Sequence, residues 1–400
     1  MTPGSAGDWR PVCGRCCHRP LNAIVKSAVF FIFFLASITG QTQHFLSDSL
    51  IDRIHHLQSK GNGFYGAGLF PSKRYKKNGK EKVEDNNIFF SALMVYTMQS
   101  AYPSFSDEGK RMIDTMIVRV KNNYHRYRNR NGDITYNFWQ THPDRPFPNS
   151  KSSNKERYKL PDDLDVTSLI YLTQQNKSKR NDSLKEKMGQ HTNLYQKKIH
   201  STNKRYRQFK AYNTWFGKNM KLEFDICVVS NVLLFVYEKK LPLNQYDQDT
   251  EFLILEVIRN NDHMNHPYIV SPSYQNSAVI LYHLARLLDA APEGHFDTIR
   301  SKIVSDLKGL LATSKNRMEQ IILLSSLYRL RESFEFKIDL KGIEYDMETF
   351  AFFKANVLSN QRLWLRKVFG KMGVFNFNFQ SEAYYQVLIL EYMELMNRNN

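Results

Sequence analysis

The stretch FDICVVSNVLLFVYEK, residues 224–239, opens on polar residues and continues as a helix that is apolar on nearly every side. A helix without a polar face has to be enclosed by other helices in a soluble chain. Five further stretches have the same character, namely residues 86–100, 163–175, 273–288, 316–330 and 382–395. This repetition predicts six enclosed inner helices in one helical repeat architecture.

Six amphipathic segments alternate with these apolar stretches along the chain. They are residues 46–60, 107–127, 182–200, 247–260, 296–311 and 343–355. In the second of them, Ile113, Met116, Ile117 and Val120 recur at helical spacing with charged residues on the other side. Six inner and six outer helices predict an all-α fold, an (α/α)6 toroid.

The predicted connections differ in length. Links from an inner to an outer helix are mostly short, whereas links from an outer helix to the next inner helix are mostly long and aromatic. Long loops carry function more often than short ones. A cavity is therefore predicted at the N-terminal ends of the inner helices, where the helix dipoles are positive.

A single domain accounts for residues 41–400, because twelve helices consume this length and no Gly/Ser-rich or Pro-rich linker interrupts them.

Residues 1–40 form an N-terminal extension. Within it, SAVFFIFFLASITG, residues 27–40, follows Lys26 and is too short for a comfortable transmembrane span. It matches the apolar core of a signal peptide. The protein is therefore predicted to be exported, periplasmic or secreted. The alternative is an uncleaved anchor, which would be the protein's only membrane contact.

Composition narrows the functional classes. The formal net charge is +17, the pI is about 9.5, and the mean hydropathy of −0.51 excludes a polytopic membrane protein. A basic chain attracts anionic ligands, while export argues against nucleic acid.

Cys13, Cys16 and Cys17 lie in the segment expected to be removed, and no second Cys/His pair at zinc-finger spacing follows them. Cys227 is predicted to be a core residue, and no metal site is predicted.

PDDLDVTSL, residues 161–169, begins the second inner helix. Asp163, Asp165 and Thr167 occupy its first turns, where acidic residues and Thr are favoured as helix caps. Capping explains one acid more readily than it explains Asp162, Asp163 and Asp165 together. Carboxylates this close repel one another, so the pKa of one of them is expected to be raised.

This segment resembles the DxDD or DxDTT signature of class II terpenoid cyclases and other squalene-cyclase-like toroid proteins. The resemblance implies that Asp165 is a Brønsted acid that protonates a terminal alkene or epoxide, and that Asp163 tunes it. Val166 departs from the pattern, because the family has Asp or Thr there. The motif covers fewer than ten residues, and beyond it the resemblance concerns architecture only.

A second interpretation is a glycan-active enzyme, either a glycoside hydrolase or a lyase. Asp225 begins the third inner helix and takes the position that Asp165 takes one repeat earlier. Two carboxylates facing one cavity suit the acid and base of a glycosidase. A third interpretation is a toroid that binds a ligand without catalysis.

The long loops and helix starts supply further candidates for ligand binding. These residues are Tyr136, Trp139, His142, Arg145, Arg157, Thr167, Tyr212, Trp215 and Tyr274. Aromatic faces stabilise carbocations or stack on sugars, and Arg binds anions through two hydrogen bonds. The predicted ligand is an anionic small molecule or oligosaccharide. No cofactor is predicted, except that a diphosphate substrate would bring Mg²⁺.

Overall fold

The computed structural model describes residues 40–76, 81–150, 159–195, 197–217, 220–332, 334–336 and 338–399. Contacts divide the chain into Met1–Gln41 and one compact unit, Thr42–Asn400. The predicted signal-peptide core up to residue 39 and the three N-terminal cysteines lie outside the described residues. None of the described helices combines the length and the apolar content needed to cross a bilayer.

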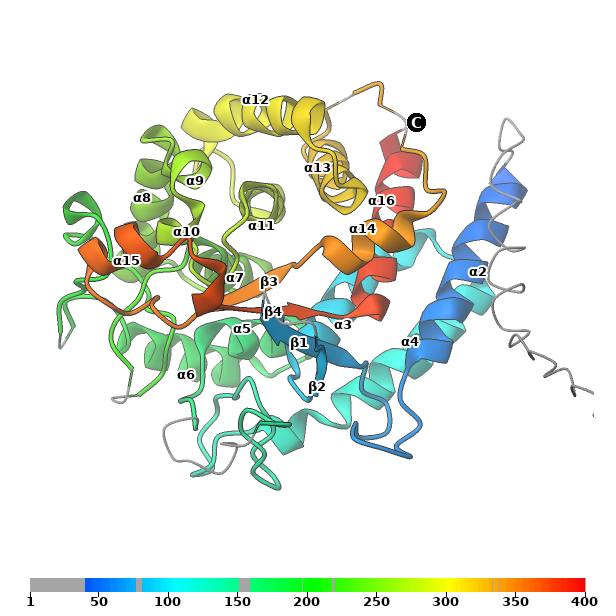
Figure 1. Cartoon of the computed structure of the whole chain (residues 1–400), viewed down its shortest axis with the longest axis horizontal. Helices are drawn as coiled ribbons and strands as arrows, with labels where there is room; N and C mark the ends of the chain where they lie inside the picture. Colours follow the sequence, from blue (N-terminus) through cyan, green and yellow to red (C-terminus); the bar gives the residue numbers. More distant parts are fainter. Residues whose placement is uncertain are drawn as a thin grey trace, which may run out of the picture. The chain divides into compact units, whose positions relative to one another are not determined.

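All six apolar stretches form helices. They are α3 (Phe89–Ala101), α5 (Leu164–Thr173), α7 (Ile226–Glu238), α11 (Ser277–Ala290), α13 (Arg317–Arg329) and α16 (Glu382–Asn399). Every residue of α5 is buried, as the all-round apolar pattern predicts. Each of these helices packs against the next in the series, and α16 packs against α3, so the series of contacts closes on itself (Figure 1).

Side chains at the helix starts explain where these helices begin. Asp163 accepts a hydrogen bond from the backbone N–H of Val166 at 2.7 Å, and Asp225 accepts from the N–H groups of Cys227 and Val228. Asn side chains cap α11 and α13 in the same way. These bonds satisfy N–H groups that have no partner within the helix. The capping interpretation of Asp163 and Asp225 is confirmed.

The amphipathic segments also form helices, although three of them end well before the predicted residue. The observed helices are α2 (Gly40–Leu57), α4 (Asp107–Lys121), α6 (Ser178–Gly189), α8 (Gln245–Arg259), α12 (Asp297–Thr313) and α14 (Ile343–Thr349). Ile113, Met116 and Val120 form a buried face of α4. The prediction of a helix over 107–127 is wrong beyond Lys121, where a turn and a 3-10 turn follow. That over 182–200 is wrong beyond Gly189, where turns follow, and that over 343–355 is wrong beyond Thr349.

Short elements fill the connections. The α-helical turns are α9 (Asp262–Asn265), α10 (Pro267–Val270) and α15 (Leu363–Phe369). The 3-10 turns are η2 (Tyr102–Ser104), η3 (Tyr124–Tyr127), η5 (Lys204–Tyr206) and η6 (Gly373–Phe375). None of these was predicted as a separate element, because so few residues are too short to show a hydrophobic period, and η3 falls within the predicted segment 107–127.

The fold is mostly helical but not all-α, and the prediction is wrong on this point. Four strands, β1 (Ser72–Lys76), β2 (Val83–Asp85), β3 (Phe353–Asn356) and β4 (Asn376–Gln380), form an antiparallel sheet in the order β2-β1-β4-β3. Arg74 of β1 and Phe353 of β3 both pair with Phe379 of β4. The sheet joins segments from the two ends of the compact unit (Figure 1). The pairing of β1 with β4 depends on contacts across some 300 residues, so no local pattern reveals it.

Candidate active site

A cavity of about 210 Å³ lies at the N-terminal ends of α3, α5 and α7. Its lining includes eight aromatic side chains: Phe89, Phe138, Trp139, Phe147, Trp215, Phe353, Phe377 and Phe379. Three carboxyl groups, those of Asp163, Asp165 and Glu223, belong to the same lining. The cavity therefore combines π-rich walls with a small number of acids.

The sheet supplies part of the aromatic wall. The ring centroid of Phe353 on β3 lies 5.0 Å from that of Phe89 and 5.4 Å from those of Phe138 and Phe379. Sequence reasoning missed the strands that hold these rings. The alternation in FNFNF, residues 375–379, is a signal that could have indicated β4, since successive strand residues face opposite sides.

Asp165 lies in the first turn of α5 and is 4% exposed. Its Oδ1 accepts a hydrogen bond from Asn231 Nδ2 at 2.7 Å, and its Oδ2 accepts one from the Tyr274 hydroxyl. Burial raises the pKa of Asp165 to about 6, against the lowering effect of these two donors. A carboxyl group with this pKa exchanges its proton near neutral pH.

Asp163 lines the cavity one residue before α5 begins. Its Oδ1 caps the helix, while its buried Oδ2 has no hydrogen-bond partner among the described residues. Burial raises the pKa of Asp163 well above its ordinary value, and the neighbouring Asp165 carboxylate raises it further. The raised pKa predicted for this acidic cluster is present at both positions.

Glu223 is the third carboxyl group, and it lies in the extended segment that precedes α7. It is 1% exposed, and its Oε2 has no partner among the described residues. Burial raises the pKa of Glu223 to about 7, although the Ser359 hydroxyl and the Arg366 guanidinium both act to lower it. The sequence placed Glu223 near the third inner helix, but its spacing did not distinguish it from a capping residue.

Asp162 is buried beside these acids and has a different role. Its oxygens accept hydrogen bonds from Asn129 Nδ2 at 2.6 Å, Thr135 Oγ1 at 2.5 Å and Asn137 Nδ2 at 3.1 Å. It is not part of the cavity lining. Asp162 therefore ties the loop before α5 to the preceding aromatic loop.

Asp225 and Tyr274 stand next to the cavity without lining it. Besides capping α7, Asp225 accepts hydrogen bonds from Ser271 Oγ at 2.6 Å and from the backbone N–H of Ser273 at 2.7 Å. Both its oxygens are thus bound by protein donors. Tyr274 is fully buried and reaches Asp165 through its hydroxyl. It supports the acid instead of contacting a ligand in the cavity.

Trp139 and Trp215 are the two predicted binding residues, apart from the acids, that line the cavity. Trp139 Nε1 donates to both carboxylate oxygens of Asp85 at 3.2 Å, so the ring is held in place. Trp215 Nε1 has no hydrogen-bond partner among the described residues. Its indole N–H is therefore a buried donor without an acceptor in the part of the chain that the structure describes.

Other predicted binding residues contact protein groups. Thr167 Oγ1 accepts from the backbone N–H of Tyr136 at 3.0 Å, and the Tyr136 ring packs against other tyrosines. The Tyr212 hydroxyl donates to Asp247 Oδ1 at 2.8 Å. None of the three lines the cavity. Their polar groups stabilise the loops around the helix starts.

The predicted basic residues are not brought to this cavity. His142 and Arg145 are exposed and do not line it, and the Arg145 guanidinium lies 5.9 Å from the Phe64 ring centroid. Arg157 lies outside the described residues. Among the described lining residues there is no Lys, Arg or His. An anionic group would therefore meet three acids here and no base.

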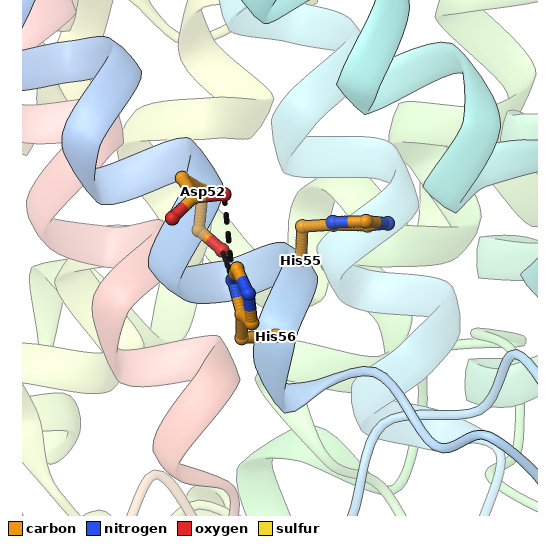
Figure 2. A group of neighbouring side chains, drawn as sticks. All are labelled: Asp52, His55 and His56. Carbon is orange, nitrogen blue, oxygen red and sulfur yellow. Dashed lines mark hydrogen bonds and ion pairs between the residues drawn. The ribbon is translucent and has the colours of Figure 1, made fainter.

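Asp52, His55 and His56 on α2 form the one group of potential metal ligands found among the described residues, with ligand atoms within 4.8 Å of one another. Figure 2 shows His56 beside Asp52, at 3.3 Å between Nδ1 and Oδ1, while the His55 ring extends away from this pair. His55 Nε2 lies 3.2 Å from Arg119 Nη1. The Arg119 guanidinium therefore opposes binding of a cation through His55 Nε2.

Comparison with known proteins adds no relative to this picture. No family model matches the sequence, and a search of curated proteins finds no significant match. The resemblance to terpenoid cyclases therefore rests on the motif at residues 161–169 and on the predicted helical architecture. What the cavity does has to be inferred from its own side chains.

Proposed function

We propose that residues 42–400 form an (α/α)6 toroid whose cavity catalyses protonation-initiated cyclisation of an isoprenoid. The single observation that carries this proposal is the position of Asp165, a buried carboxyl group with a raised pKa in an aromatic cavity. Protonating an alkene requires a neutral acid in a dry site, and the resulting cation requires walls that stabilise it without reacting. The closed series of inner-helix contacts supports the toroid.

The proposed reaction balances without a cofactor. The O–H bond of Asp165 breaks as the π electrons of a terminal alkene form a new C–H bond, which leaves a carboxylate and a carbocation. A second alkene of the same chain attacks the cation and closes a ring. Loss of a proton from carbon to a carboxylate of the cavity ends the reaction, so the product is an isomer of the substrate.

The hydrogen bonds of Asp165 suit this role. Asn231 and the Tyr274 hydroxyl both donate to it, and they stabilise the carboxylate that forms when the proton leaves. Val166 is fully buried and lines the cavity where the cyclase motif has a polar residue. In this proposal Asp163 and Glu223 supply the additional carboxyl groups that the motif lacks at Val166.

The glycan-active alternative has less support. Sugar hydroxyl groups need many hydrogen-bond partners, because leaving polar groups of the site unpaired costs about 1–3 kcal/mol each. The described cavity lining is dominated by aromatic and aliphatic side chains. Asp225, the proposed partner of Asp165 in a glycosidase pair, does not belong to it. If an acid and base pair operates on a sugar here, Glu223 replaces Asp225.

The test is turnover in D₂O with linear isoprenoids of 15 to 30 carbons. A protonation-initiated cyclase produces a cyclic isomer that carries one solvent deuterium, seen as a one-unit increase in mass. Turnover should be highest below pH 6 and fall about tenfold per pH unit well above it, because only neutral Asp165 donates.

Asp165→Asn should abolish this activity. Asp114→Asn is the matched control, since Asp114 is exposed on α4 and accepts a hydrogen bond only from Tyr102 among the described residues. Cyclic product without deuterium, or unchanged turnover in Asp165→Asn, would overturn the proposal. So would failure of the whole isoprenoid series while a glycan is cleaved.

A further inference from the structure

A second cavity, of about 500 Å³, adjoins the aromatic one. Its lining is basic and polar: Lys197, Lys198, His200, Ser201, Met220, Lys221, Leu222 and Asn360. Met220 and Asn360 line both cavities. The two spaces therefore share a wall, although their chemistry is opposite.

The segment from Met220 to Glu223 forms much of that shared wall. Lys221 and Leu222 line the basic cavity, whereas Glu223 lines the aromatic one. The segment is held by hydrogen bonds from Glu223 N–H to Asn213 Oδ1 at 2.8 Å and from Ser201 Oγ to the Leu222 carbonyl at 3.2 Å. These two hydrogen bonds hold the backbone segment that places Lys221 at the basic cavity and Glu223 at the aromatic one.

A buried arginine binds the backbone of another residue that lines the basic cavity. Arg366 on α15 is 2% exposed and donates to the carbonyl oxygens of Ser201 at 2.5 Å, Tyr268 at 2.9 Å and Ile269 at 3.0 Å. Ser201 lines the basic cavity. The guanidinium therefore holds the cavity wall and adds a permanent positive charge behind it.

Among the described residues, no carboxylate forms an ion pair with the lysines of this cavity. Lys197, Lys198 and Lys221 are exposed, and in the part of the chain that the structure describes the lysine ion pairs involve other residues. Lys221 Nζ has a neutral partner, Gln361 Oε1, at 3.5 Å. Three unpaired ammonium groups around one hollow attract an anion with several oxygens.

We propose that the two cavities bind a single amphipathic anion, with its apolar chain among the aromatic rings and its oxyanion head group among Lys197, Lys198 and Lys221. The proposal deepens the proposed function and rests on it only for the identity of the chain. Orientation follows from charge, because the three acids of the aromatic cavity repel an oxyanion head group and the lysines attract it. A phosphate, a carboxylate and a sulfate share this chemistry.

Calorimetric titration of the purified protein with decyl phosphate tests the proposal. Its saturated chain cannot be protonated, so binding is independent of whether the cyclase proposal is right. Decyl phosphate should bind more tightly than both decyltrimethylammonium, which has the same chain, and inorganic phosphate, which has only the head group. Decanoate and decyl sulfate, compared with decyl phosphate, identify the preferred head group.

Variants separate the two halves of the site. The triple variant Lys197→Gln, Lys198→Gln, Lys221→Gln should bind decyl phosphate on the order of tenfold more weakly, the combined effect of three exposed charge contacts. The control carries Lys177→Gln, Lys179→Gln and Lys315→Gln, which remove the same charge from exposed positions outside both cavities and should bind as the wild type does.

The apolar half is tested at Val228, which lines the aromatic cavity on α7. Val228→Phe should weaken decyl phosphate but leave inorganic phosphate unchanged, with circular dichroism as the check on folding. If this variant unfolds, Ala355→Leu on β3 serves the same purpose. Equal binding of decyltrimethylammonium and decyl phosphate, or equal weakening by the lysine triple variant and its control, would overturn the proposal.

Discussion

Replacing Asp165 by Asn should change how the stability of the protein depends on pH. Burial raises the pKa of Asp165 from 3.8 to about 6, a difference of about 2 units. Each unit corresponds to about 1.4 kcal/mol, so the ionised side chain costs the folded state about 3 kcal/mol. The folded protein binds this proton more tightly than the unfolded chain does. Protonation of Asp165 therefore stabilises the folded state fully below about pH 4. This stabilisation is lost as the pH rises from about 4 through about 6.

Asn at this position does not titrate, and it keeps an oxygen that can accept the hydrogen bond from Asn231. The free energy of unfolding of Asp165→Asn minus that of the wild type should therefore increase by about 2–3 kcal/mol between pH 4.5 and pH 8. Urea unfolding followed by tryptophan fluorescence measures both values at each pH. Only the change with pH is compared, because any fixed effect of the substitution cancels. A difference that stays constant across this range would refute the assignment of a raised pKa to Asp165.

Three further predictions concern the surroundings of this acid. Glu223→Gln should become more stable relative to the wild type as the pH rises from 5 to 8.5. The reason is that the pKa of Glu223 is raised to about 7, so its ionisation destabilises the folded state of the wild type. Thermal melts of both proteins at the two pH values measure this difference. Asp162→Ala should lose about 3 kcal/mol in urea unfolding, because three side-chain hydrogen bonds that tie the 129–137 loop to the start of α5 are removed. A loss below 1 kcal/mol would contradict the role given to Asp162. Phe353→Ala should lower the free energy of unfolding by about 3–5 kcal/mol in the same assay and weaken binding of decyl phosphate. An effect on stability alone would mean that this side chain of the sheet does not contact the ligand.

The helices were the predictable part of the fold. Hydrophobic period, apolar content and capping residues act within about ten residues of one another, so a linear pattern contains them. All six inner helices are present, and Asp163 and Asp225 cap theirs as their positions indicate. Boundaries were less certain. Residues 190–195 continue the polar pattern of α6 but form turns and an isolated bridge.

The candidate site was predictable in part. Asp163, Asp165, Trp139 and Trp215 line the cavity, as expected for loops and helix starts at that end of the inner helices. Equivalent position in a repeat did not imply an equivalent role, since Asp225 is bound by protein donors on both oxygens. Its sequence neighbour, Glu223, lines the cavity instead. Two residues of separation before α7 therefore distinguish the carboxyl group that lines the cavity, that of Glu223, from the one that caps the helix, that of Asp225.

The sequence by itself determined the mostly helical character, the order of apolar and amphipathic helices, and the segment in which Asp163 and Asp165 lie, because these follow from local periodicity and capping. Tertiary structure alone decided the sheet, the division into an aromatic and a basic cavity, and the environment of each acid. The donors to Asp165 come from 66 and 109 residues away. The physical reason is that desolvation, hydrogen-bond partners and strand pairing depend on what lies across space from a residue, and no local pattern in the chain records it.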